Sequence, residues 1–242
     1  MGKIIISGGD KGGVGKSMAS ALAADSLINA GQTLLIVEGD AAIPDIALRF
    51  SACPQVATTG VNLNRAGDQE AAVTRLGNAL EHAASQGQDV LINLPAGSAD
   101  TLDDLALVIR EIANTSGFTL RVLYSLGPHR SSTDSLIKSL AQGLLGSVDP
   151  IHRTLVFPAF LGAPESFDWL KHPNRAEFIG AGSQEIVVPA LRPDSIRDQV
   201  LAAPGTFTAL AGNQEALTLT ERALFKRWLT HSHTALAAVL GD

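Results

Sequence analysis

The sequence predicts an α/β protein in which a mostly parallel sheet carries helices on both faces. Short apolar runs alternate along the whole chain with longer stretches of helical spacing. The run TLLIV is continuously apolar, as in parallel strands that are buried on both faces. No internal repeat, low-complexity tract or Gly/Ser/Pro linker interrupts the alternation. We therefore expect one domain that covers residues 1–242.

Each expected element has a local signal. Glycine follows the first and second long helical stretches, as is common at helix C-termini, and proline or glycine follows several of the strands. The spacing Thr218-x-x-Glu221 predicts a capping box at the start of the last helix. Pro158 predicts either an edge position or an early end for its strand. Residues 41–64 hold two prolines, and we expect only loops and short helical turns there. The expected strands are 4–6, 33–37, 89–94, 119–126, 154–160 and 185–188, and the expected helices are 17–30, 68–85, 101–114, 131–145, 194–202 and 218–240.

A glycine-rich loop at 7–15 joins the first expected strand to the first expected helix. Strand, glycine-rich loop and helix in this order are the context of a phosphate-binding loop. Glycines let several backbone N–H groups converge on one anion, and the helix start adds unpaired N–H groups and the positive end of its dipole. On this interpretation Lys16 reaches the β- and γ-phosphates and the Ser17 hydroxyl contacts Mg²⁺. The alternative is an ordinary turn with a chance Gly-Lys-Ser.

The usual G-x-x-x-x-G-K-[ST] pattern is not met, because Asp10 occupies its first position. The segment K-G-G-V-G-K-S at 11–17 resembles instead the ParA/MinD family of deviant-Walker P-loop ATPases, with clear landmarks over roughly residues 1–130 and weak ones over 150–205. The resemblance implies that Lys11 acts on the γ-phosphate across a nucleotide-dependent homodimer; a solvated loop lysine is the alternative. It also implies a nucleotide-binding set of Gly12, Gly13, Val14, Gly15, Lys16, Ser17 and Met18.

Acidic residues follow the second expected strand, at the edge where ligands bind in open α/β sheets. Within the resemblance, Asp40 corresponds to the residue that helps to place the attacking water, and Glu38 stands where the family has an aspartate. Asn93 stands where the Walker B aspartate is expected, so weaker metal binding and either slow hydrolysis or a partly degraded switch are expected, with Glu38 as a compensating acid. Solvent-facing loop acids are the alternative. The implied catalytic residues are Lys11, Lys16 and Asp40, and the implied Mg²⁺ ligands are Ser17, Glu38, Asp40 and Asn93.

The segment EIVVPALRPDS at 185–195 weakly resembles the family's loop that packs on the adenine. It implies nucleotide contacts for Pro189, Arg192 and Asp194. The asparagine that the family often has at the end of the preceding strand is missing, since Phe157 and Pro158 stand there. An ordinary loop is an equally good explanation, so a preference for adenine rests on the resemblance alone.

Composition narrows the function classes. The net charge of −6 and the pI near 5.5 disfavour strong binding to the DNA backbone and leave weak non-specific binding open. The single Cys53 excludes an intrachain disulfide, and the histidines show no metal-ligand spacing; His231 and His233 are expected on the surface. The absence of a signal-type or membrane-spanning segment predicts a cytoplasmic protein.

Membrane binding is not expected. The last helix is better explained as docked on the protein through Phe225, Trp228 and Leu229, with its basic residues facing outward.

The leading hypothesis is an ATP-driven dimerising switch of the ParA kind that acts in plasmid or DNA segregation, maintenance or conjugative transfer. Its expected cofactors are ATP and Mg²⁺, and its expected partner is a DNA-binding adaptor or a protein of the transfer machinery. Three alternatives stay open: a nucleotide-binding interaction module with little turnover, a MinD-like membrane-surface ATPase, and an ATP-dependent biosynthetic enzyme.

Overall fold

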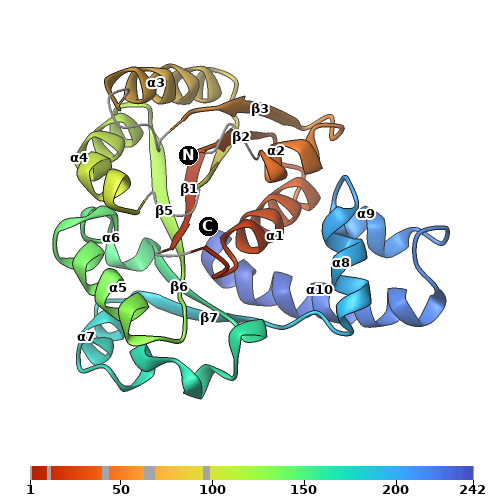
Figure 1. Ribbon diagram of the computed structural model, residues 1–242. Helices are drawn as coiled ribbons and strands as arrows, with labels where there is room; N and C mark the ends of the chain where they lie inside the picture. The colour runs from red at the N-terminus through yellow and green to blue at the C-terminus, as the bar shows by residue number, and fades with distance from the viewer. Residues whose placement is uncertain (1, 10–11, 40–43, 63–68, 95–98, 242) are drawn as a thin grey trace.

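Seven parallel strands form one sheet in the computed structural model, which describes residues 2–9, 12–39, 44–62, 69–94 and 99–241 (Figure 1). The strand order is β3-β2-β4-β1-β5-β6-β7, so β1 lies at the centre between β4 and β5. The strands are β1 (Gly2–Gly9), β2 (Leu34–Glu38), β3 (Val56–Gly60), β4 (Asp89–Asn93), β5 (Phe118–Ser125), β6 (Arg153–Pro158) and β7 (Gln184–Val188).

Helices cover both faces of the sheet, as Figure 1 shows. Short 3₁₀ turns surround β6: η1 (Pro150–His152) precedes it, and η2 (Ala159–Leu161), η3 (Pro164–Ser166) and η4 (Asp168–Lys171) follow it. One face carries α3 (Gln69–Ser85), α4 (Ala99–Thr115), α5 (Arg130–Gln142), α6 (Leu144–Ser147) and α7 (Asn174–Gly180). The other carries α1 (Lys16–Asn29), α2 (Asp45–Phe50), α8 (Asp194–Ala202), α9 (Phe207–Gly212) and α10 (Leu219–Leu240).

The sheet separates two hydrophobic cores. Successive side chains of a strand point to opposite faces, so Ile4 and Ile6 lie in the core under α3–α7 while Ile5 lies in the core under α1 and α10. All three are fully buried. This two-sided burial explains why the central strands are continuously apolar in the sequence.

The edge strand β3 differs from the sequence-based expectation, which places only loops and short helical turns in residues 41–64. Its sequence, VATTG, has no apolar run, and the strand is hydrogen-bonded to β2 alone. Its middle residues Ala57 and Thr58 are exposed. An edge strand with exposed side chains does not need the apolar run that marks a buried strand, so nothing in the sequence indicated β3. The run at 185–188 is therefore the seventh strand of the sheet and not the sixth.

Two further expectations need correction. The strand that holds Pro158 lies between β5 and β7, so an edge position is wrong, while its early end at Pro158 is confirmed. The helix expected over 131–145 is broken at Gly143 into α5 and α6. The Asp103 carboxylate causes this break, since it accepts from the Leu144 amide and the Ser139 hydroxyl, both at 2.8 Å, and a Cβ at Gly143 would lie 2.1 Å from it.

The last helix is docked on the molecule, as expected. Thr218 and Glu221 form the predicted capping box. Phe225, Trp228 and Leu229 are buried. At the far end of α10, the Lys3 ammonium donates to the Leu240 carbonyl at 3.1 Å, and Arg121 donates to the Val239 carbonyl. The C-terminal helix is thus fastened to the start of β1 and to the middle of β5.

Candidate functional site

The glycine-rich loop leaves the carboxyl end of the central strand and enters α1, in the predicted order. Gly13 and Gly15 adopt left-handed backbone conformations, with φ of 79° and 85°, and Gly15 is the N-cap of α1. Residues with a Cβ rarely adopt this conformation. At the end of β1, a Cβ on Gly9 would lie 2.5 Å from the Ser125 carbonyl oxygen of β5. The loop therefore needs its glycines both for conformation and for close packing.

The predicted phosphate-binding residues meet at this junction. Gly12, Gly13 and Ser17 are exposed, whereas Val14 is buried. The Lys16 side chain is largely buried, and its backbone carbonyl accepts from the Ser7 hydroxyl at 3.1 Å. In the first turn of α1 Ser17 is thus exposed, and the first backbone N–H groups of the helix have no acceptor within it. Lys11 and Asp40, two of the three predicted catalytic residues, lie outside the described residues.

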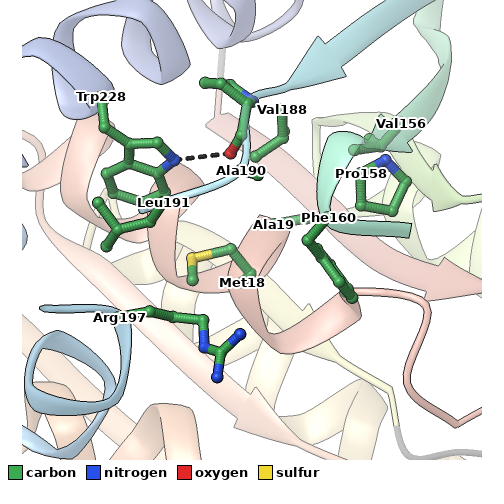
Figure 2. A pocket seen from close by; sticks show the side chains of 12 residues that line it. Met18, Ala19, Val156, Pro158, Phe160, Val188, Ala190, Leu191, Arg197 and Trp228 are labelled. Carbon is green, nitrogen blue, oxygen red and sulfur yellow. Dashed lines mark hydrogen bonds between the residues drawn. The ribbon is translucent and has the colours of Figure 1, made fainter. Parts of the chain in front are cut away.

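A small, mostly apolar pocket, partly open to solvent, lies beside Gly15 (Figure 2). Met18 of α1 and Phe160 face it from one side, and Trp228 of α10 closes the other. The Trp228 indole N–H donates to the Pro189 carbonyl at 2.7 Å, which fastens the loop after β7 to α10. Pro189, predicted to contact a nucleotide base, lines this pocket.

The other two residues predicted in that loop do not line the pocket. Arg192 and Asp194 are exposed and pair with each other at 2.6 Å. Arg197 does line it, and it pairs with Asp194 at 3.2 Å. Arg197 could not be predicted from the sequence, because no motif marks a pocket-lining residue in the first turn of a short helix. Sequence reasoning also missed Phe160 and assigned Trp228 to docking alone.

A buried polar network joins β2, β4, α1 and α2 near the loop. The Glu38 carboxylate accepts at 2.8 Å from three N–H groups: the Ile46 and Ala47 amides reach Oε1, and the Asn93 side-chain amide reaches Oε2. The Asn93 carbonyl oxygen in turn accepts from the Ser20 hydroxyl at 2.7 Å. Burial raises the pKa of Glu38, while these hydrogen bonds partly oppose that rise.

Glu38 and Asn93 do not fit the predicted role of Mg²⁺ ligands. Mg²⁺ requires oxygen ligands in near-octahedral geometry and usually keeps several waters. Both side chains are buried, and an ion would have to share or displace the donors that their oxygens already accept. Asn93 moreover contacts Ser20, which lies one helical turn after Ser17, the residue predicted to share the ion with it. Of the predicted ligands that the structure describes, Ser17 alone presents its oxygen to solvent, and the described ranges contain no cluster of three or more His, Cys, Asp or Glu side chains suited to a metal ion.

The sequence matches no family model and no curated protein. Solved structures do match. The MinD cell division ATPase of Pyrococcus furiosus has a TM-score of 0.52 at 18% identity, over 95% of this chain and 99% of that chain. Apo McdA from Cyanthece has a TM-score of 0.55 at 12% identity, over 100% of both chains. The septum site-determining protein MinD of Pyrococcus horikoshii OT3, complexed with Mg-ADP, has a TM-score of 0.50 at 16% identity, over 94% of this chain and 96% of that chain.

The chain has the fold of the MinD-type ATPases. This confirms the expected α/β class with a parallel sheet, and it confirms the ParA/MinD resemblance at the level of the fold. At these identities the likeness shows the MinD-type fold and does not assign an activity. In the part of the chain that the structure describes, no helix combines the length and apolar character needed to cross a membrane.

Proposed function

We propose that this protein binds ATP and uses it as a dimerisation switch of the ParA kind. The observation that supports this most is the junction of β1 and α1, where Gly13 and Gly15 are left-handed and Gly12, Gly13 and Ser17 are exposed. An anion there would meet several backbone N–H groups and the positive end of the helix dipole. A triphosphate is the anion that suits this loop sequence, because the Lys16 ammonium follows the glycines directly.

Each remaining part of the nucleotide has a candidate contact. The base would enter the apolar pocket between Met18, Phe160 and Pro189, which lies directly beside the loop. Mg²⁺, when bound, neutralises phosphate charge, and the Ser17 hydroxyl is the described group that could hold it. Lys11 would act on the nucleotide of the second copy, which makes ATP a requirement for the dimer.

The biological role that we propose is DNA or plasmid segregation, maintenance or conjugative transfer in the cytoplasm. The acidic net charge favours a DNA-binding adaptor or a transfer-machinery protein as the partner, over strong direct contact with DNA. The docking of α10 through Phe225 and Trp228 disfavours a membrane-surface role for that helix.

A second candidate is a nucleotide-bound interaction module with little turnover. The specific observation in its favour is that Asn93 is bonded to Glu38 and Ser20 in place of a free Walker B carboxylate. Phosphate release by the purified protein separates the two candidates: slow but measurable release favours the switch, and none at saturating ATP favours the module.

Calorimetric titration with ATP tests the shared core of both candidates. Lys16→Ala should weaken ATP binding at least tenfold, on the order of 1.4 kcal/mol. Lys171→Ala removes an exposed lysine in η4 and should leave the affinity unchanged. In light scattering with Mg-ATP, Lys11→Ala should lower the dimer fraction while ATP still binds. Failure of the natural protein to bind ATP would refute the proposal.

A further inference from the structure

Glu38 and Asn93 are direct neighbours across two parallel strands. They are paired in register at the carboxyl ends of β2 and β4. The Glu38 side chain reaches past this pair to the first turn of α2, where it accepts from the amides of Ile46 and Ala47. These amides have no partner inside their own helix, and the N-cap Pro44 supplies no side-chain cap. A carboxylate from β2 thus performs the capping that the sequence just before α2 does not.

The carboxylate at 38 and the amide at 93 require each other. An ionised carboxylate only accepts hydrogen bonds, whereas an asparagine side chain both donates and accepts. Asn93 donates to Glu38 on one side and accepts from Ser20 on the other. A carboxylate at position 93 would instead lie against the carboxylate of Glu38, and the two charges would repel each other in a site where Glu38 is 1% and Asn93 6% exposed.

We infer that Glu38 is a positioning residue that anchors the start of α2, and that Asn93 serves as its hydrogen-bond donor and not as a metal ligand. One side chain thereby ties the end of β2 to the start of α2. Ser20 extends the network to α1, one turn beyond the proposed phosphate site. Any effect on nucleotide binding rests on the proposed function, while the network itself does not.

A four-protein cycle in the absence of nucleotide tests this inference. Asn93→Asp should lower the Tm by about 6 °C or more, because it leaves two carboxylates in contact. Adding Glu38→Gln to Asn93→Asp should restore the Tm to within about 3 °C of the natural protein. In that double variant the new amide at position 38 donates to the new carboxylate at position 93 and still accepts from the two α2 amides. Every hydrogen bond is therefore kept, with donor and acceptor exchanged.

Glu38→Gln alone should cost little, because Asn93 can turn its amide round and donate to Ser20, whose hydroxyl can accept. Asn29→Asp is the matched control. Asn29 also donates to a buried carboxylate, that of Asp25, at 3.0 Å, but Asn29 itself is exposed. The new carboxylate at position 29 can therefore turn into water while Asp25 keeps its favourable interaction with Arg49, and the Tm should fall by less than about 3 °C. The inference is overturned if Asn93→Asp is as stable as the natural protein, or if Glu38→Gln does not rescue it.

ATP affinity with Mg²⁺ and with EDTA gives a second readout, which a purely structural effect would not move. The ratio of the two affinities should stay within about threefold between the natural protein and the double variant that carries Glu38→Gln and Asn93→Asp. A tenfold or larger rise in the ratio for that variant would mean that residue 93 can ligate the metal, and it would overturn the inference. If the natural protein binds no ATP at all, the proposed function fails while the thermal cycle still decides the inference.

Discussion

Two buried carboxylates lie by opposite ends of α1, Glu38 of β2 and Asp25 of α1 itself, and their hydrogen-bond donors differ. Near the start of the helix, Ser20 joins the network of Glu38, whose donors in the described structure are all neutral N–H groups. Near the end, Asp25 accepts from the Thr208 amide at 3.2 Å and from its hydroxyl at 3.0 Å, and His233 Nε2 lies 2.8 Å from it.

A cation accompanies the second carboxylate. Asp25 interacts favourably with the guanidinium of the buried Arg49, whose pKa burial lowers to about 10. Asp25 thus links α1 to α9 and α10, which come late in the chain, and its role is stability. The described donors to Glu38 carry no charge, and they join it to the start of α2 and, through Asn93, to Ser20 of α1. The end of α1 is therefore held to α9 and α10 by a carboxylate beside a cation, whereas its start is joined to β2, β4 and α2 by neutral donors around Glu38.

The largest effect is expected from Asp25→Ala. It removes the acceptor for Thr208 and Asn29 and leaves His233 without its carboxylate, so stability should fall by about 3 kcal/mol. ATP affinity should not change, because Asp25 lies about 13 Å along the helix from Lys16. Thermal unfolding beside calorimetric titration checks both parts. A fall in affinity as large as that in stability would break the comparison.

Glu38→Ala should have the next largest effect, about 2 kcal/mol, because it leaves the amides of Ile46, Ala47 and Asn93 without their acceptor. Unlike Asp25→Ala, it should also weaken ATP binding, because the network that it breaks reaches Ser20, one turn beyond Ser17 in α1. Calorimetric titration measures this difference. A variant that is destabilised but binds ATP normally would show that Glu38 is a stability residue like Asp25.

The sequence predicted the start of α1 far better than its end. The glycine loop has a fixed order of residues, and buried parallel strands leave continuous apolar runs, so the fold class and the loop context followed from local pattern. Contacts between distant segments have no such pattern. His233 was expected on the surface, yet it meets Asp25, more than two hundred positions earlier in the chain.

For the candidate site, the sequence indicated individual residues but not how their side chains contact one another. Glu38 and Asn93 were both singled out, and the structure brings them together, but as a hydrogen-bonded pair. Sequence could not distinguish a pair from two metal ligands, because the same residue types suit both. Pro189, predicted to contact a nucleotide, lines the pocket, whereas Arg192 and Asp194, predicted for the same role, are exposed and pair with each other.

Two glycines at the opposite ends of α1 offer a matched pair with smaller effects. Gly13 and Gly31 have nearly equal left-handed φ values of 79° and 78°, and a Cβ at either position would meet no atom of the described residues within 4 Å. Gly13→Ala and Gly31→Ala should therefore each cost about 1 kcal/mol of stability from backbone strain alone.

Only Gly13→Ala should weaken ATP binding, because it changes the direction of the loop amides. Urea unfolding and calorimetric titration of both variants test this. Equal losses of affinity would mean that the loop does not hold the phosphates.

The smallest expected effect is on the pH dependence of stability. Because burial raises the pKa of Glu38 above 4.5, the folded protein takes up this proton at a higher pH than the unfolded chain does. As the pH rises from 4.5 to the raised value, Glu38 therefore lowers stability, and above that value its cost is constant. Glu38→Gln cannot ionise, so its stability relative to the natural protein should increase with pH across this window and then level off. Parallel urea unfolding of the two proteins at several pH values measures the difference, and a difference that decreases with pH would mean that the folded protein favours the charged form of Glu38.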